Sequence, residues 1–292
     1  MVLKGHQSWS SVILAVVATA ALVGGCTSGA GSSGAASAAA SAGGSALPDS
    51  ALIKKIQAAG KIRFGVAVGI PWLGKDPATN EYFGSAKFMA EKLAARLGVK
   101  PEYVEQTYAN MIAALQSDKI DVAVAPLYAT AQRLEVVDMT PYAVGGFCYL
   151  LKKDNATVTK LEDLNNASVI MANAEGTGTL QQTSAKYPLA QQLTRFAEVG
   201  EVAFVQEVLS GRATVAPVDN TTAAAFAAKY DLKVLPDDCY NNPDIPTPVA
   251  AAYNKGDPGF KGFFDAFVVS IRSEIDAESE KFLDVKYVFP EG

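Results

Sequence analysis

One order of strands and helices occurs twice along the chain. In the first half, strands alternate with helices at 61–68, 85–97, 100–105, 108–117 and 120–125. The same order restarts at 168–171, 178–186, 195–199, 202–210 and 214–218. The local sequence repeats as well, since 115–124 parallels 209–218. Strand–helix–strand units make parallel sheets with helices on both faces, so we expect an α/β protein with two similar lobes, each a mostly parallel sheet flanked by helices.

Residues that follow the strands are the candidates for a binding site. Ligands of open parallel sheets bind beyond the carboxyl ends of the strands, so two facing lobes should form a cleft between those ends. The segments at these places are 69–72, 126–133, 173–179 and 219–220.

Two charged residues in these segments are of opposite sign. The guanidinium group of Arg133 has the planar shape that matches a carboxylate with two parallel hydrogen bonds, although a lone arginine is more often a solvated surface charge. Asp219 ends a strand and can pair with an ammonium group, or it can cap the helix that begins near Thr221. Both interpretations of each residue stay open from position alone.

The sequence Glu-Gly-Thr-Gly-Thr at 175–179 lies between a strand and a helix. Its backbone amides and the helix dipole can hold an anion, or the segment is simply a helix start capped by threonine. The aromatic residues Trp72, Tyr108 and Tyr142 stand where they can stack on a ligand or pack in the core.

The N-terminus has the parts of an export signal. Lys4 precedes an apolar run at 9–23, and two glycines then stand before Cys26. This pattern resembles the lipobox of bacterial lipoproteins, which predicts a signal peptide at 1–25 and a lipid on Cys26. The alternative is a transmembrane anchor, for which the run is too short and too broken. The following Gly, Ser and Ala residues predict a flexible tether over 26–50.

Composition excludes several functions. The only histidine, His6, lies in the predicted signal peptide, so the mature chain has no imidazole for a Ser-His-Asp triad, a Cys-His pair or a histidine metal site. We expect no metal and no cofactor. The net charge is −5 and there is no basic run, which argues against nucleic acid as a partner.

The chain has three cysteines. If Cys26 carries lipid, Cys148 and Cys239 remain as a pair, and an exported location permits a disulfide between them. Two separately buried thiols are the alternative.

Several motifs between about 52 and 287 occur in an order that resembles one known family. They are Gly-Ile-Pro-Trp-Leu-Gly at 69–74, Ala-Ala-Leu-Gln-Ser-Asp-Lys-Ile-Asp-Val at 113–122 followed by Thr130 and Arg133, Val-Val-Asp at 136–138 with Pro141-Tyr142, Leu-Glu-Asp-Leu at 161–164, and Lys-Gly-Asp at 255–257. The family is the extracellular solute-binding proteins, family 3, which serve transporters of polar amino acids. The resemblance implies the two-lobed Venus flytrap fold of type II, with lobe 1 at 51–151 plus 249–292 and lobe 2 at 152–248.

The resemblance also implies roles for single residues. Arg133 would bind the α-carboxylate of an amino acid, Thr177 and Gly178 would donate further hydrogen bonds to it, and Asp219 would receive the α-ammonium group. Tyr108 matches an aromatic residue that packs over the ligand side chain. The chain departs from the family pattern where Pro126 and Tyr128 replace a serine or threonine, so that a bulky ring enters the pocket, and where Gly69 replaces a frequent aromatic residue, so that Trp72 would take over its stacking.

The function implied is that of a monomeric, lipid-anchored, extracytoplasmic receptor. It would capture an amino acid or a related zwitterion and deliver it to the permease of an ABC importer, without catalysis. Two alternatives share the scaffold: an exported dehydratase that uses a carboxylate such as Glu175 as general acid, and a sensor subunit that reports ligand to a membrane partner.

Overall fold

A computed structural model describes residues 46–76, 78–196 and 200–282. The predicted signal peptide, Cys26 and the tether up to residue 45 lie outside these residues. The compact unit begins at Ala46, and Ser50 is buried, where it caps the first helix and donates to Oδ2 of Asp257 at 2.7 Å. Residues 46–50 therefore belong to the folded unit, and the predicted end of the tether at residue 50 is wrong.

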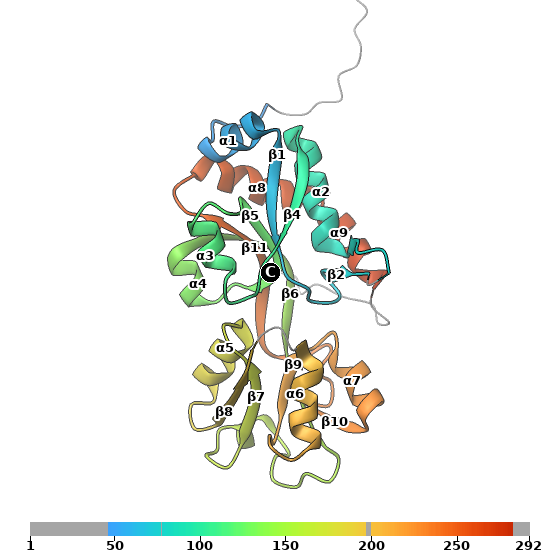
Figure 1. The fold of residues 1–292 in the computed structure, drawn as a ribbon. Coiled ribbons are helices and arrows are strands. Elements are labelled where there is room, and N and C mark those ends of the chain that lie inside the picture. Colours follow the sequence, from blue (N-terminus) through green and yellow to red (C-terminus); the bar gives the residue numbers. More distant parts are fainter. Residues whose placement is uncertain (1–45, 77, 197–199, 283–292) are drawn as a thin grey trace, which may run out of the picture. The chain divides into compact units, whose positions relative to one another are not determined.

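The described part of the chain alternates helices and strands (Figure 1). The helices are α1 (Ala51–Ala59), α2 (Ser85–Leu97), α3 (Met111–Gln116), α4 (Ala131–Val136), the 3-10 helix η1 (Leu161–Leu164), α5 (Gly178–Lys186), α6 (Gly200–Leu209), α7 (Ala223–Tyr230), α8 (Pro258–Ser270) and α9 (Arg272–Glu280). The strands are β1 (Lys61–Val66), β2 (Gly74–Lys75), β3 (Tyr82–Phe83), β4 (Lys100–Glu105), β5 (Val122–Tyr128), β6 (Val137–Lys152), β7 (Ile170–Ala174), β8 (Gln191–Arg195), β9 (Ala216–Asp219), β10 (Leu232–Leu235) and β11 (Asp244–Asn254).

The elements form two lobes, as the duplication predicts. In the first lobe, β1 pairs in parallel with β4 and with β5, and α1 to α4, α8 and α9 belong to this lobe. In the second lobe, β7 pairs in parallel with β8 and is bridged in parallel to Val215, just before β9. The parallel pairs confirm the predicted fold class. The strand predicted at 195–199 is β8 at Gln191–Arg195, and 197–199 lie outside the described residues.

Two long strands connect the lobes. The strand β6 pairs antiparallel with β11 along most of its length, and its last part at 147–152 pairs antiparallel with β9 and β10 of the second lobe. β11 also pairs antiparallel with β5, so it joins this connection to the sheet of the first lobe. Figure 1 shows β6 and β11 running between the upper and the lower group of elements. The duplicated pattern did not predict these antiparallel strands.

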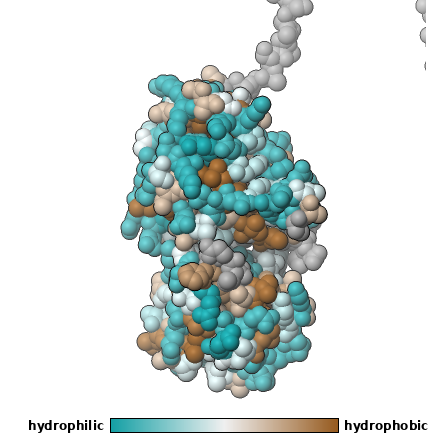
Figure 2. All heavy atoms as spheres, viewed as in Figure 1, coloured by the Kyte–Doolittle hydropathy of each residue, from teal (hydrophilic) through white to brown (hydrophobic). Residues whose placement is uncertain are grey.

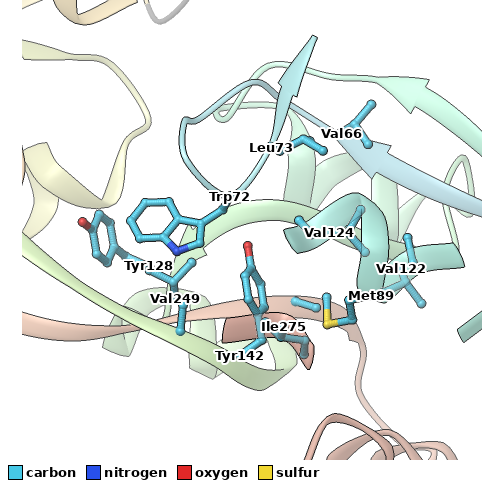
Figure 3. Close-up of a cluster of buried hydrophobic side chains, with 14 of the residues drawn as sticks. Val66, Trp72, Leu73, Met89, Val122, Val124, Tyr128, Tyr142, Val249 and Ile275 are labelled. Atoms are coloured by element: carbon cyan, nitrogen blue, oxygen red, sulfur yellow. The ribbon is translucent and has the colours of Figure 1, made fainter. Parts of the chain in front are cut away.

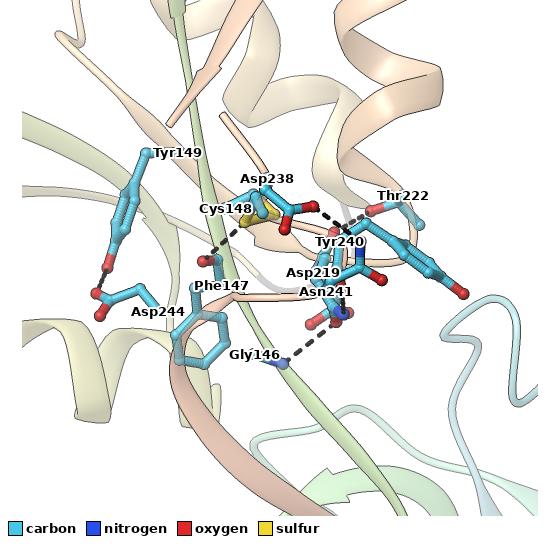
Figure 4. Close-up of a disulfide and its surroundings, with 12 residues drawn as sticks. Gly146, Phe147, Cys148, Tyr149, Asp219, Thr222, Asp238, Tyr240, Asn241 and Asp244 are labelled. Atoms are coloured by element: carbon cyan, nitrogen blue, oxygen red, sulfur yellow. Dashed lines mark hydrogen bonds between the residues drawn. A yellow bond between two sulfur atoms is a disulfide. The ribbon is translucent and has the colours of Figure 1, made fainter. Parts of the chain in front are cut away.

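A disulfide joins Cys148 on β6 to Cys239 in the loop between β10 and β11, with the two Cα atoms 5.7 Å apart (Figure 4). Cys148 also pairs with Val218 of β9, which precedes Asp219. The disulfide therefore fixes the loop at 236–243 against β6, the strand that pairs with β9, which carries Asp219.

The described helices include none that is long and apolar enough to cross a membrane. Across the same residues, no group of three histidine, cysteine, aspartate or glutamate side chains is placed to hold a metal ion.

Candidate functional site

A cavity of about 790 Å³ lies between the lobes. Its walls come from the last residues of β5, β7 and β9, from residues that follow these strands and β1, and from α6 and α7. The polar side chains of the wall include Arg133, Tyr108, Tyr128, Asp219 and Glu201, and much of the rest is apolar. Figure 2 shows hydrophobic side chains gathered on one face where the upper and the lower group of elements meet.

Arg133 lies in the cavity wall as a buried cation. Thr130 caps α4 and accepts from the Arg133 backbone N–H, which fixes the start of the helix that carries the arginine. The side chain is only 5% exposed; Nη1 donates to the carbonyl of Tyr128 at 2.9 Å and Nη2 to that of Gly176, in the second lobe, at 3.4 Å.

Arg133 has no ion-pair partner among the described residues. Among the described residues, no carboxylate lies within 4 Å of the guanidinium group, and three of its five N–H donors have no partner. Burial lowers the pKa of Arg133 to about 10, so it remains charged at neutral pH. A buried cation without a counter-charge is costly, and an anionic ligand in the cavity would supply the missing charge.

The start of α5 lies against this guanidinium group. A Cβ atom on Gly178 would come within 2.8 Å of the Tyr128 Cβ and 3.4 Å of Arg133 Nη1, so only glycine fits here without a shift. The first N–H groups of a helix have no intrahelical partner, and the Gly178 amide can therefore donate beside Arg133. Thr177 differs from its predicted role, because its hydroxyl donates to the Ala174 carbonyl at 2.8 Å and accepts from the Leu180 amide. That hydroxyl is a helix cap.

Asp219 ends β9 on the opposite side of the cavity. Its Oδ1 accepts a hydrogen bond from the hydroxyl group of Tyr128, which ends β5 in the other lobe. Burial raises the pKa of Asp219 to about 6, although the hydrogen bond from Tyr128 works in the opposite direction. Asp219 is therefore mostly ionised at neutral pH, and a ligand cation would stabilise this form further.

Glu201 is a second carboxylate in the cavity, and the sequence analysis missed it. It lies in the first turn of α6; its Oε1 accepts from the Asp219 backbone N–H at 3.2 Å and its Oε2 from the Thr222 hydroxyl at 3.0 Å. Burial, and then the nearby charge of Asp219, raise the pKa of Glu201 to about 8. Glu201 also follows a predicted strand, the one at 195–199. The expectation that the site lies after the strands therefore applies to it, but the candidate segments did not include this place.

Two of the four predicted aromatic residues line the cavity. Tyr128 and Tyr108 do so, and the Tyr108 hydroxyl donates to the carbonyl of Val68 at 3.0 Å. Burial raises the pKa of the Tyr108 phenol well above its ordinary value, so it stays a neutral donor.

Trp72 and Tyr142 do not line the cavity, and their predicted contact with a ligand is wrong. They are 1% and 0% exposed and lie in the core of the first lobe (Figure 3). Gly69 and Leu73 exchange two backbone hydrogen bonds, at 2.8 and 3.0 Å, and the tight turn between them directs the Trp72 ring inward. A Cβ atom on Gly145 would meet both the Trp72 ring, at 3.3 Å, and the Tyr128 hydroxyl, at 2.8 Å, so Trp72 packs behind the cavity wall.

Glu175 is exposed and is not part of the cavity wall. The carboxylates that face the cavity are instead those of Asp219 and Glu201.

Comparison with known proteins points to one family. The family model for the bacterial extracellular solute-binding proteins, family 3, matches residues 62–285. Among curated proteins, the chain is 32% identical over 99 residues to the probable histidine-binding protein of Campylobacter jejuni, covering 34% of this chain and 37% of that protein. It is 28% identical over 123 residues to the L-cystine-binding protein TcyJ of Escherichia coli, which covers 41% of this chain and 46% of that protein. The matches thus span less than half the length of these two relatives.

Solved structures match over most of the chain. An ancestral amino acid-binding protein described as a precursor of cyclohexadienyl dehydratase is 30% identical, with a TM-score of 0.67 over 80% of this chain and 99% of that one. A binding component of an ABC transporter from Wolinella succinogenes, complexed with lysine, is 26% identical, with a TM-score of 0.66 over 77% of this chain and 97% of that one.

Proposed function

The chain belongs to family 3 of the bacterial extracellular solute-binding proteins, and from this we propose that it is the substrate-binding lipoprotein of an ABC importer. It captures an amino acid or a related zwitterion in the cavity between its lobes and passes it to a permease. The anchor is a lipid on Cys26, the location is extracytoplasmic, and the protein acts as a monomer without catalysis.

The lobe boundaries are part of the proposal. Lobe 1 comprises 51–151 and 249–292, and lobe 2 comprises 152–248. The pairing of β9 and β10 with 147–152 favours a first crossing earlier in β6, at Gly145 and Gly146, because the sheet of the second lobe already includes Phe147.

The observation that carries the function is the pair Arg133 and Asp219 in the walls of one cavity, one from each lobe. The carboxylate of an amino acid binds the unpaired N–H donors of Arg133 and the amide of Gly178. The ammonium group binds the Asp219 carboxylate and stabilises its ionised form. Since each end of the ligand contacts a different lobe, binding stabilises the arrangement in which the lobes are closed.

Contacts across the cavity support this closure. Besides the bond between Tyr128 and Asp219, the Thr130 hydroxyl donates to Oε1 of Gln181 at 2.9 Å. These bonds join the same edges that a ligand would join, so a ligand adds to an existing set of contacts between the lobes.

A ligand screen tests the proposal. Thermal-shift and calorimetric titrations with the twenty standard L-amino acids and related amines should find at least one compound that raises the melting temperature and binds with a stoichiometry of about one. The variant Glu175→Gln is the matched control, because it changes an exposed carboxylate outside the cavity. A folded protein that responds to none of these compounds contradicts the proposal.

Labelling tests the anchor. Cells that express the full chain with an alkyne-tagged palmitate should label the protein, and Cys26→Ser should abolish the label. Labelling that survives this substitution contradicts a lipid on Cys26. Genes for a permease and an ATPase beside this one would favour transport over the sensor function, which uses the same binding chemistry.

A dehydratase is the second candidate, because the cavity holds two acids with raised pKa values and one similar structure is described as a precursor of such an enzyme. Glu175, the general acid predicted for this alternative, is outside the cavity. We expect no turnover when prephenate and arogenate are incubated with the protein. Formation of the dehydrated aromatic product, lost in Asp219→Asn, would instead establish the enzyme.

A further inference from the structure

The cavity wall contains two partly buried acids, Asp219 and Glu201, and one buried base, Arg133. Asp219 and Glu201 are directly connected, because the backbone N–H of Asp219 donates to Glu201. Thr222 connects them a second time: its hydroxyl donates to Glu201 at 3.0 Å and its backbone N–H donates to the Asp219 carbonyl at 3.0 Å. The Glu201 carboxylate is therefore held against the backbone of the short segment that carries Asp219.

Arg133 is the buried cation of the cavity wall. When a simple zwitterion binds, its carboxylate pairs with Arg133 and its ammonium group pairs with Asp219. Arg133 is then not available to pair with Glu201. Glu201 is then left in the wall with only neutral partners, an amide and a hydroxyl. The other cation of the wall is Lys229, which is exposed and lies over the ring of Tyr230 at 5.1 Å.

We propose that Glu201 and Asp219 form one anionic subsite that selects amino acids with a second cationic group, so that the ligand has a net charge of about +1. The inference rests on the proposed function and specifies its ligand class. Cationic amino acids are favoured over neutral ones, because only a second ligand cation can form an ion pair with Glu201, which otherwise keeps its proton. Acidic amino acids add a negative charge beside the two acids and are disfavoured.

The size and lining of the cavity fit such a ligand. Its volume of about 790 Å³ leaves room for a long side chain. The apolar wall formed by Val202, Ala224 and Phe226 lies on α6 and α7, near the carboxylates. Side chains that carry a cation on a methylene stem are suited to a wall of this kind, because the stem packs on apolar surface while the charged end reaches the carboxylates.

Binding of a cationic ligand at this subsite should release a proton from the two acids. The titratable groups that share the cavity with Glu201 are Asp219, Arg133, Lys229 and the phenols of Tyr108 and Tyr128. Burial raises the pKa of both acids, and the charge of Asp219 raises that of Glu201 further, to about 8, so Glu201 holds a proton near neutral pH. A second ligand cation displaces that proton. The affinity for a cationic amino acid should therefore increase as the pH rises from about 6 to about 8.

Calorimetry with matched ligand pairs tests the inference. L-arginine is compared with the neutral L-citrulline, and L-lysine with the neutral L-norleucine, on the wild-type protein and on Glu201→Gln. We expect the wild type to bind the cationic member of at least one pair about tenfold more tightly or better. Glu201→Gln should reduce this preference to within about threefold.

The pH dependence gives a second readout. The wild-type affinity for the preferred cationic ligand should rise about tenfold between pH 6 and pH 8, and Glu201→Gln should flatten this rise. Glu175→Gln should behave as the wild type in both measurements. Thermal melting of each variant establishes that it is folded.

The outcomes separate the two proposals. Equal or tighter binding of the neutral members, or a preference that Glu201→Gln leaves intact, overturns the anionic subsite and keeps the amino acid receptor. A protein that binds no amino acid at all overturns the proposed function, and the subsite fails with it.

Discussion

The hydroxyl group of Tyr128, in the first lobe, donates a hydrogen bond to Oδ1 of Asp219, in the second lobe. The two residues end β5 and β9, the strands whose carboxyl ends face each other across the cavity. The bond therefore joins the lobes at the place where the ammonium group of a ligand is proposed to bind.

Removing this bond should loosen the ligand-free protein. Tyr128→Phe should lower the free energy of unfolding by about 1 kcal/mol and increase the radius of gyration measured by small-angle scattering without ligand. Tyr103→Phe is the matched control, because the buried Tyr103 hydroxyl has no partner among the described residues. An unchanged radius of gyration in Tyr128→Phe would show that the bond does not hold the lobes together.

Arg133 should be sensitive to the shape of its side chain as well as to its charge. Arg133→Lys keeps the cation but loses the planar pair of donors, and we expect the affinity for an amino acid to fall about 100-fold. Calorimetry measures the loss, and thermal melting checks the fold. An affinity within about threefold of the wild type would exclude Arg133 as the carboxylate site.

The free energy of unfolding should decrease as the pH rises, because of Asp219 and Glu201. The folded protein raises the pKa of Asp219 to about 6 and that of Glu201 to about 8, so it binds protons that the unfolded chain releases. The free energy of unfolding without ligand should therefore decrease from about pH 5 to pH 8.5. Glu201→Gln removes the larger contribution and should be more stable than the wild type by about 2 kcal/mol at pH 8.5, with little difference at pH 5.

Urea unfolding at the two pH values measures this difference. The isosteric amide can still accept one of the two hydrogen bonds that Glu201 accepts. A difference between variant and wild type that does not change with pH would mean that Glu201 ionises normally in the folded protein.

The disulfide should contribute strongly to stability, because it joins residues 91 positions apart. Replacing both Cys148 and Cys239 by alanine should cost about 2–5 kcal/mol of unfolding free energy. Each single substitution should cost about as much as the double one, since either breaks the bond. A wild-type protein whose melting temperature does not change under a strong reductant would contradict this contribution.

Trp72 should matter for stability and not for the ligand. Trp72→Phe removes buried surface from the core, and we expect a loss of about 1–3 kcal/mol of unfolding free energy. The affinity for an amino acid should stay within about twofold of the wild type. A tenfold loss of affinity in a folded variant would restore Trp72 to the binding site.

The sequence predicted the fold class and the place of the cavity for one physical reason. The duplicated order of elements requires parallel sheets, and the carboxyl ends of parallel strands share an edge. Arg133 follows such an end and Asp219 stands at another, so the pattern places both residues at the cavity. The disulfide was left open, because the sequence does not show which residues of β6 meet the loop at 236–243.

Other features depend on contacts between distant residues. The pairing of β6 with β11 joins 137–147 to 244–254, and no local pattern encodes it. The inward direction of the Trp72 ring follows from the turn between Gly69 and Leu73, which strand periodicity does not describe. Glu201 resembles an ordinary acidic residue in the first turn of a helix; only the position of β9 beside α6 brings it to Asp219.

A crystal structure with a bound amino acid tests the central claim most directly. The protein is crystallised with the standard L-amino acid that gives the largest thermal shift. We predict that the ligand carboxylate accepts hydrogen bonds from the Arg133 guanidinium group and that the ligand ammonium group donates to Asp219. A ligand bound outside this cavity, or one in the cavity that contacts neither Arg133 nor Asp219, would contradict the account.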